Sequence, residues 1–151
     1  MKYVSIALLL IVSQAHADEL SDKKCALASS ILLPQIPGLT ISTSRISETS
    51  KSETALKFAQ KHSTSESDAI GTAQAFGFLD ATTDNILRNF FQSGNYSLIG
   101  NTMKQGIEGH LSSSSKVEID INAVGYTATY AFYCGITPSG EAIALPLGLI
   151  R

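Results

Sequence analysis

The sequence has few of the residues on which enzyme chemistry depends. It contains no tryptophan, only two cysteines and only three histidines. It has no GxSxG nucleophile elbow and no GxxxxGKS/T or GxGxxG phosphate-binding loop. A zinc site needs several His, Cys or carboxylate ligands at workable spacing, and neither His62 nor His110 has such neighbours. We therefore predict no catalytic residue, no metal site and no cofactor, and we interpret both histidines as surface or helix-cap residues.

The sequence also lacks a strong excess of either charge. It carries 11 basic and 13 acidic side chains, for a formal net charge of −2. Proteins that bind nucleic acid or anionic lipid usually show a basic patch or stripe. The composition therefore argues against nucleic acid as a partner.

A long apolar run occurs once, at the N-terminus. Lys2 precedes the apolar stretch Val4–Val12, and Ala15–Ala17 has the small-x-small pattern of a cleavage site. The stretch is shorter than the roughly 20 residues that a membrane-spanning helix needs. We predict that residues 1–17 are a cleaved signal peptide. Residues 18–151 should then form a single exported domain, periplasmic or secreted, without membrane insertion.

Both cysteines follow this leader. In an oxidising compartment, Cys25 and Cys134 are expected to form one intramolecular disulfide. The alternative is a redox-active pair, but neither cysteine has the CxxC spacing typical of such sites. We therefore predict a structural disulfide between the front of the chain and a late strand.

The helical signals lie in the first three quarters of the chain. Apolar residues, Cys25 among them, recur at helical spacing before Pro34, which should end the first helix. The stretch 66–92 fits either one kinked helix or two. The residues 112–115, all serine, suggest a flexible linker. The predicted helices are Asp22–Leu33, a helix from about Ser50 to His62, Glu66–Gln92 and Ser97–Leu111.

The strand signals are strongest in the last third. Lys116–Ile136 alternates apolar and polar residues, with a phase slip near Gly125 that requires a β-bulge or a break between two strands. Leu39–Ile46 and Ala142–Ile150 also read as strands, and Pro146 favours an edge position for the latter. We predict an α+β fold, with helices packed on one face of a small antiparallel sheet formed mainly by the C-terminal third. An all-helical bundle with a terminal hairpin is the alternative.

The best candidates for a binding surface lie in these strands. Glu118 and Asp120 are two residues apart and therefore face the same way. They could hold a cation or act as acid and base, but a solvated strand face is the simpler interpretation. Tyr133 falls on the strand face opposite Tyr126, Tyr130 and Phe132, and an exposed tyrosine there would suit a protein contact.

Three functions remain open at this stage. We favour a non-catalytic exported protein that binds another exported protein, such as an immunity protein or an inhibitor of a toxin or cell-wall hydrolase. The alternative is an accessory or assembly factor of a bacterial envelope or secretion system. The third is a small enzyme or ligand carrier that uses Glu118 and Asp120 or the histidines, which would require a concave site that holds a histidine beside a carboxylate.

Overall fold

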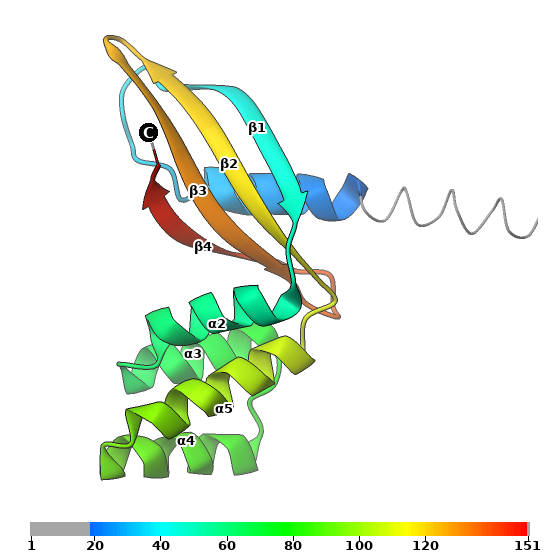
Figure 1. Cartoon of the computed structure of the whole chain (residues 1–151), viewed down its shortest axis with the longest axis vertical. Coiled ribbons are helices and arrows are strands. Elements are labelled where there is room, and N and C mark those ends of the chain that lie inside the picture. Colours follow the sequence, from blue (N-terminus) through cyan, green and yellow to red (C-terminus); the bar gives the residue numbers. More distant parts are fainter. Residues whose placement is uncertain (1–18, 151) are drawn as a thin grey trace, which may run out of the picture.

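The computed structural model describes residues 19–150, which form an α+β fold as predicted (Figure 1). The predicted signal peptide lies outside these residues. The first helix covers residues 19–30. No helix within the described part of the chain is both long and apolar enough to cross a membrane. The remaining elements are β1 (Thr40–Glu48), α2 (Lys51–His62), α3 (Glu66–Phe76), α4 (Ala81–Ser93), α5 (Tyr96–Gly109), β2 (Ser113–Ala123), β3 (Tyr126–Ile136) and β4 (Ala142–Leu149).

The four strands form one antiparallel sheet in the order β1-β2-β3-β4. Ala123 pairs with Tyr126, so the phase slip is a two-residue hairpin turn between β2 and β3 rather than a bulge. Gly125 in this turn has a φ of 73°, which a residue with a side chain rarely adopts. β4, which contains Pro146, lies at one edge of the sheet as predicted, and β1 forms the other edge.

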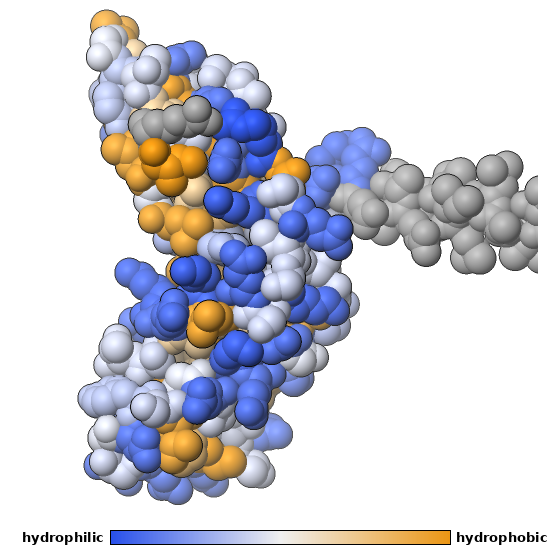
Figure 2. Space-filling model, in the orientation of Figure 1, coloured by the Kyte–Doolittle hydropathy of each residue, from blue (hydrophilic) through white to orange (hydrophobic). Residues whose placement is uncertain are grey.

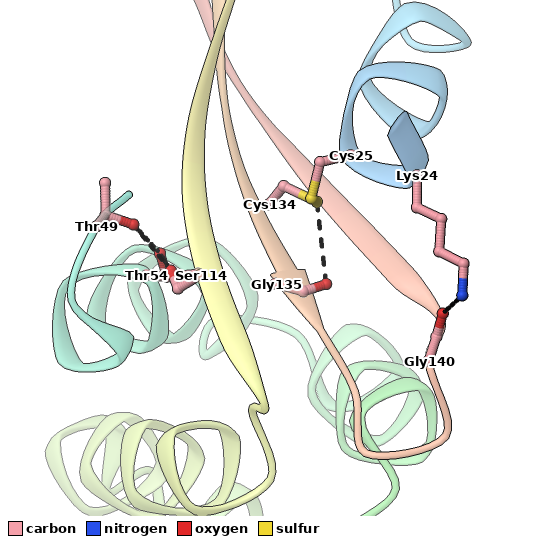
Figure 3. The surroundings of a disulfide bond; sticks show 8 residues. All are labelled: Lys24, Cys25, Thr49, Thr54, Ser114, Cys134, Gly135 and Gly140. Atoms are coloured by element: carbon pink, nitrogen blue, oxygen red, sulfur yellow. Dashed lines mark hydrogen bonds between the residues drawn. A yellow bond between two sulfur atoms is a disulfide. The ribbon is translucent and has the colours of Figure 1, made fainter. Parts of the chain in front are cut away.

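The two faces of the sheet pack against different helices. Val117, Phe132 and Cys134 belong to what we call the disulfide face, which is buried together with Cys25 of the first helix. Cys25 and Cys134 are bonded, with 2.07 Å between the sulfurs, which confirms the predicted disulfide (Figure 3). The neighbouring residue Tyr133 points to the opposite face, which we call the bundle face because it packs into the core of α2–α5.

The four helices of the bundle each begin at a residue that caps the free backbone N–H groups of the first turn. The side chains of Ser50, Ser65, Asp80 and Asn95 each accept a hydrogen bond from the backbone N–H three residues later. The segment 66–92 is therefore two helices. Gly77 ends the first in a left-handed conformation, and Asp80 starts the second.

The predicted flexible linker at residues 112–115 is wrong. Ser113 begins β2, and Ser114 lies opposite Gly135 of β3. Ser114 is buried, and its hydroxyl bonds to the hydroxyls of Thr49 and Thr54, at 2.9 Å from the former. A serine is suited to position 114 because its short hydroxyl is buried between β2 and the start of α2 and finds hydrogen-bond partners there.

Gly106 of α5 lets the ring of Phe78, in the connection between α3 and α4, lie close against the helix, which gives a test of the bundle. A Cβ at this position would lie 2.4 Å from Cε2 of Phe78, whereas a Cβ at Gly100 of the same helix would have an ordinary contact of 3.9 Å. Gly106→Ala should lower the free energy of unfolding by about 1–3 kcal/mol through overpacking. Gly100→Ala should raise it by up to about 1 kcal/mol by favouring helix. Urea denaturation of both variants measures the two effects, and equal effects would contradict this packing.

The disulfide closes a loop with a sequence separation of 109 residues. Replacing both cysteines by alanine should lower the free energy of unfolding by about 4 kcal/mol, because the unfolded chain regains the entropy of the open loop. Urea denaturation measures this loss. Reductant should produce a similar loss in the wild type and none in the double variant. A loss below about 1 kcal/mol would show that the first helix holds its place without the bond.

Candidate functional site

The first helix exposes large apolar side chains on the side turned away from the sheet. Leu27 is 64% exposed and Ile31 69% exposed, while Leu20 on the same stripe is half exposed. Cys25 and Ser29 lie on the opposite, buried side of the helix. Ile31 directly follows the last helical residue, and its backbone N–H still bonds to the carbonyl oxygen of Leu27 at 3.2 Å. The two side chains therefore keep the i, i+4 arrangement and form a continuous apolar stripe in contact with solvent.

A hollow of about 550 Å³ adjoins the C-terminal end of this helix. It is formed where the chain turns at Pro34 and Pro37 and enters β1, and Ile41 at its rim is 46% exposed. Its other lining residues are Ser30, Leu33, Gln35, Ile36 and Leu39. We call the hollow, together with Leu20, Leu27, Ile31, Leu32 and Ile41, the N-terminal apolar surface.

The predicted candidates Glu118 and Asp120 do share one strand face, and both carboxylates are paired with the cation of Arg45. Arg45 of β1 donates to Asp120 Oδ1 at 3.0 Å and to Glu118 Oε2 at 3.3 Å. Thr129 donates to Asp120 Oδ1 at 2.6 Å, and Lys116 lies 3.8 Å from Glu118 Oε1. The hydrogen bond with Asp120 is the main reason why the pKa of Arg45 is raised. These carboxylates are therefore engaged in a cross-strand ion-pair network on a partly solvated face.

Tyr133 is not exposed, so the expectation that it contributes to an accessible surface is corrected. It is buried on the bundle face beside Leu145, and its hydroxyl donates to the carboxylate of Glu53 on α2. Burial is the first cause that raises the pKa of Tyr133 to about 12, and the hydrogen bond with Glu53 is the second. The strand period gave the correct face for Tyr133, but it did not reveal that α2 covers that part of the face.

The two histidines each line a hollow. His110 lines one of about 420 Å³ with Asp80, but Asp80 caps α4, and His110 Nδ1 lies 3.0 Å from the Gly106 carbonyl oxygen. His62 lines a second hollow of about 300 Å³ together with Asp68, and its ring stacks on Phe58. Burial lowers the pKa of His62, although the charge of Asp68 acts in the opposite direction. Only the second arrangement leaves a histidine beside a carboxylate whose side chain does not cap a helix.

A further apolar strip runs along the end of β4. Leu147, Leu149 and Ile150 are between 40% and 58% exposed. Figure 2 shows apolar side chains along the β4 side of the sheet and polar ones toward β1 and β2. This strip has fewer exposed large apolar residues than the N-terminal apolar surface, and none of its three residues lines any of the hollows described for residues 19–150.

Comparison with known proteins adds no relative. No family model, no curated protein and no solved structure matches the chain. Within residues 19–150, no three His, Cys, Asp or Glu side chains gather closely enough to hold a metal ion. The function must therefore be inferred from the surfaces themselves.

The sequence contained a signal for the N-terminal apolar surface. Helical spacing alone did not show which apolar residues of the first helix face the sheet and which face solvent. Leu27 and Ile31 lie 120° or more around the helix from Cys25, at about 100° per residue. Once the disulfide assigns the Cys25 side to the sheet, these two side chains must point outward. The hollow beside them depends on how the chain crosses from the helix to β1, which no local pattern encodes.

The contact between Tyr133 and Glu53 predicts how stability depends on pH. The folded state raises the pKa of Tyr133 from 10.0 to about 12. The stabilisation that protonated Tyr133 gives to the folded state should therefore be complete below pH 10 and be lost as the pH rises toward 12. Urea denaturation at pH 9 and pH 11.5 should show a smaller alkaline loss for Tyr133→Phe than for the wild type. Glu53→Gln should fall between them, and parallel profiles for all three would contradict this assignment.

Proposed function

We propose that this protein is exported and binds another exported protein without chemistry of its own. Immunity proteins and inhibitors of toxins or cell-wall hydrolases belong to this class. The observation that carries the proposal is the N-terminal apolar surface, where Leu27 of the first helix and Ile31 directly after it are each more than three-fifths exposed, on a segment that the disulfide fixes to the sheet. Apolar patches of this kind on a folded protein are typical of contact surfaces.

The energetics support binding at this surface. Full burial of a leucine or isoleucine side chain contributes about 1.5–3 kcal/mol, so a partner that covers this stripe gains most from these residues. The disulfide holds the helix in place before the partner arrives. Less conformational entropy is then lost on association than for a mobile helix.

The export part of the proposal is supported by the pattern of residues 1–17 and by the disulfide. A small-x-small site after a short apolar run is typical of a secretory leader. Structural disulfides persist mainly in oxidising compartments such as the periplasm or the outside of the cell. An accessory factor of an envelope or secretion system would use the same surface. It would differ in binding a large assembly rather than a single protein.

A second candidate function is small-ligand binding or acid–base chemistry at His62. The observation that favours it is the hollow that His62 shares with Asp68, between the bundle and the start of β4. The lowered pKa of His62 keeps its imidazole neutral at a lower pH than usual, as a general base requires. This site involves neither Leu27 nor Ile31, so the two candidates can be separated by mutation.

Site-specific photocross-linking in the cell that exports the protein tests the main proposal. The full chain carries a photoreactive residue either at Ile31 or at Asn89, an exposed polar position on α4. We expect one discrete adduct with another exported polypeptide from position 31 and none from position 89. Adding Leu27→Asp should abolish the adduct and change the free energy of unfolding by less than about 1 kcal/mol, because this side chain is exposed.

The controls decide between the candidates. Asn89→Asp should leave the adduct from position 31 unchanged, and so should His62→Gln. The same adducts from positions 31 and 89, or none from position 31, would refute protein binding at this surface. An adduct that is lost with His62→Gln but kept with Leu27→Asp would place the protein contact at the hollow of His62 and refute the N-terminal apolar surface as the binding site.

A further inference from the structure

The free edge of β1 is open along its whole length. β1 lies at the end of the sheet and pairs only with β2. Every residue of Thr40–Glu48 is exposed except Ile46, which is partly buried, so no described element covers this strand. The outward N–H and C=O groups of such a strand form a template for pairing with another chain.

The register shows which backbone groups point outward. The backbone N–H of Thr49 donates to the carbonyl oxygen of Ser114 at 3.1 Å, one step beyond the pair of Glu48 and Ser115. Hydrogen-bonded and non-hydrogen-bonded pairs alternate along an antiparallel ladder. Between the bulge near Ile41 and the end of β1, the groups that point to the free edge therefore belong to Ser44, Ile46 and Glu48.

The two edges of the sheet differ in how they resist pairing. β4 contains Pro146, which has no N–H, and its register is broken between Ala131 and Phe132 of β3. β1 has no proline and no lysine, and it is regular from Thr43 to Glu48. Its one cation, Arg45, is bonded to carboxylates of β2 and so lies over the sheet instead of guarding the edge. β1 therefore offers the longer regular edge, which is free of proline and of register shifts from Thr43 to Glu48.

Two hollows flank this edge on the disulfide face. Ile41 lines the apolar hollow of about 550 Å³ at the start of β1. Ile46 and Glu48 line a second hollow of about 220 Å³ near the end of β1, together with Ser21 and Asp22 of the first helix. The first hollow suits an apolar side chain. The second is lined by the carboxylate of Glu48, so it suits a basic side chain.

We propose that β1 binds an extended segment of a partner protein, which adds to the sheet as a fifth strand antiparallel to β1. Main-chain hydrogen bonds to Ser44, Ile46 and Glu48 would provide much of the affinity, and the two hollows the specificity. The segment carries a basic residue near Glu48 and, further toward its C-terminus on the same face, an apolar residue near Ile41. This inference rests on the proposed protein-binding function and identifies the form of the partner.

A second copy of this chain fits the edge less well. Its own β1 would bring Ser44, Ile46 and Glu48 to the disulfide face, which supplies no basic side chain for the hollow of Asp22 and Glu48. A partner segment can instead continue past Ile41 onto the N-terminal apolar surface.

The test uses a random dodecapeptide library selected on the protein expressed from the full chain. Selected peptides should be enriched in a basic residue followed, at even spacing, by apolar residues. In hydrogen exchange measured by NMR, a saturating peptide should slow exchange of the Ser44, Ile46 and Glu48 amides by tenfold or more. Ser44→Pro removes an outward N–H and should weaken peptide binding at least tenfold, whereas Ser44→Ala keeps the N–H and should bind as the wild type does.

Other outcomes overturn the proposal. Equal peptide binding by the Ser44→Pro variant and the wild type would overturn it, and so would failure to select any peptide whose binding depends on β1. Slowed amide exchange that is confined to the first helix would also overturn it. So would a concentration-dependent dimer in which the β1 amides exchange slowly without peptide. Cross-linking at position 31 in the Ser44→Pro protein separates the two proposals. An undiminished adduct there would keep protein binding and remove strand addition, while absence of the adduct in the wild type would refute the proposed function itself.

Discussion

The bond between Cys25 and Cys134 determines how the rest of the N-terminal region is presented. The first helix is short, and its register against the strands would otherwise depend on a few apolar contacts and on the hydrogen bond that Lys24 Nζ donates to the Gly140 carbonyl oxygen at 2.6 Å. The covalent link fixes which side of this helix faces the strands. The opposite side, with Leu27 and Ile31, is thereby held in solvent.

The same constraint organises the disulfide face of the sheet. The chain leaves the first helix, turns at Pro34 and Pro37, and reaches the start of β1 on the far side of the sheet (Figure 1). This crossing forms the apolar hollow, while the start of the helix flanks the other end of β1. Apolar surface, hollows and an open strand edge therefore lie close together because one disulfide places the helix between them.

Local sequence patterns were sufficient for most elements. The helical stretches from about Ser50 and from Glu66 were predicted, as was the alternation of β2 and β3, because both signals act between residues near in sequence. The serines at 112–115 were misread because their pairing depends on Gly135 and Thr54, which are distant in sequence. Tyr133 was placed on the right strand face, but its burial depends on the position of α2. The hollows could not be predicted for the same reason: they form between elements.

The hydroxyls of Thr49, Thr54 and Ser114 bond to one another where the helical bundle joins β1 and β2 (Figure 3). β1 and β2 are neighbouring antiparallel strands, so all of α2–α5 occupies the place of a hairpin loop that these hydroxyls close at its neck. Insertions, deletions or rearrangements among the four helices are therefore compatible with an unchanged strand register. A lineage of such proteins would be expected to diversify its bundle while conserving the neck.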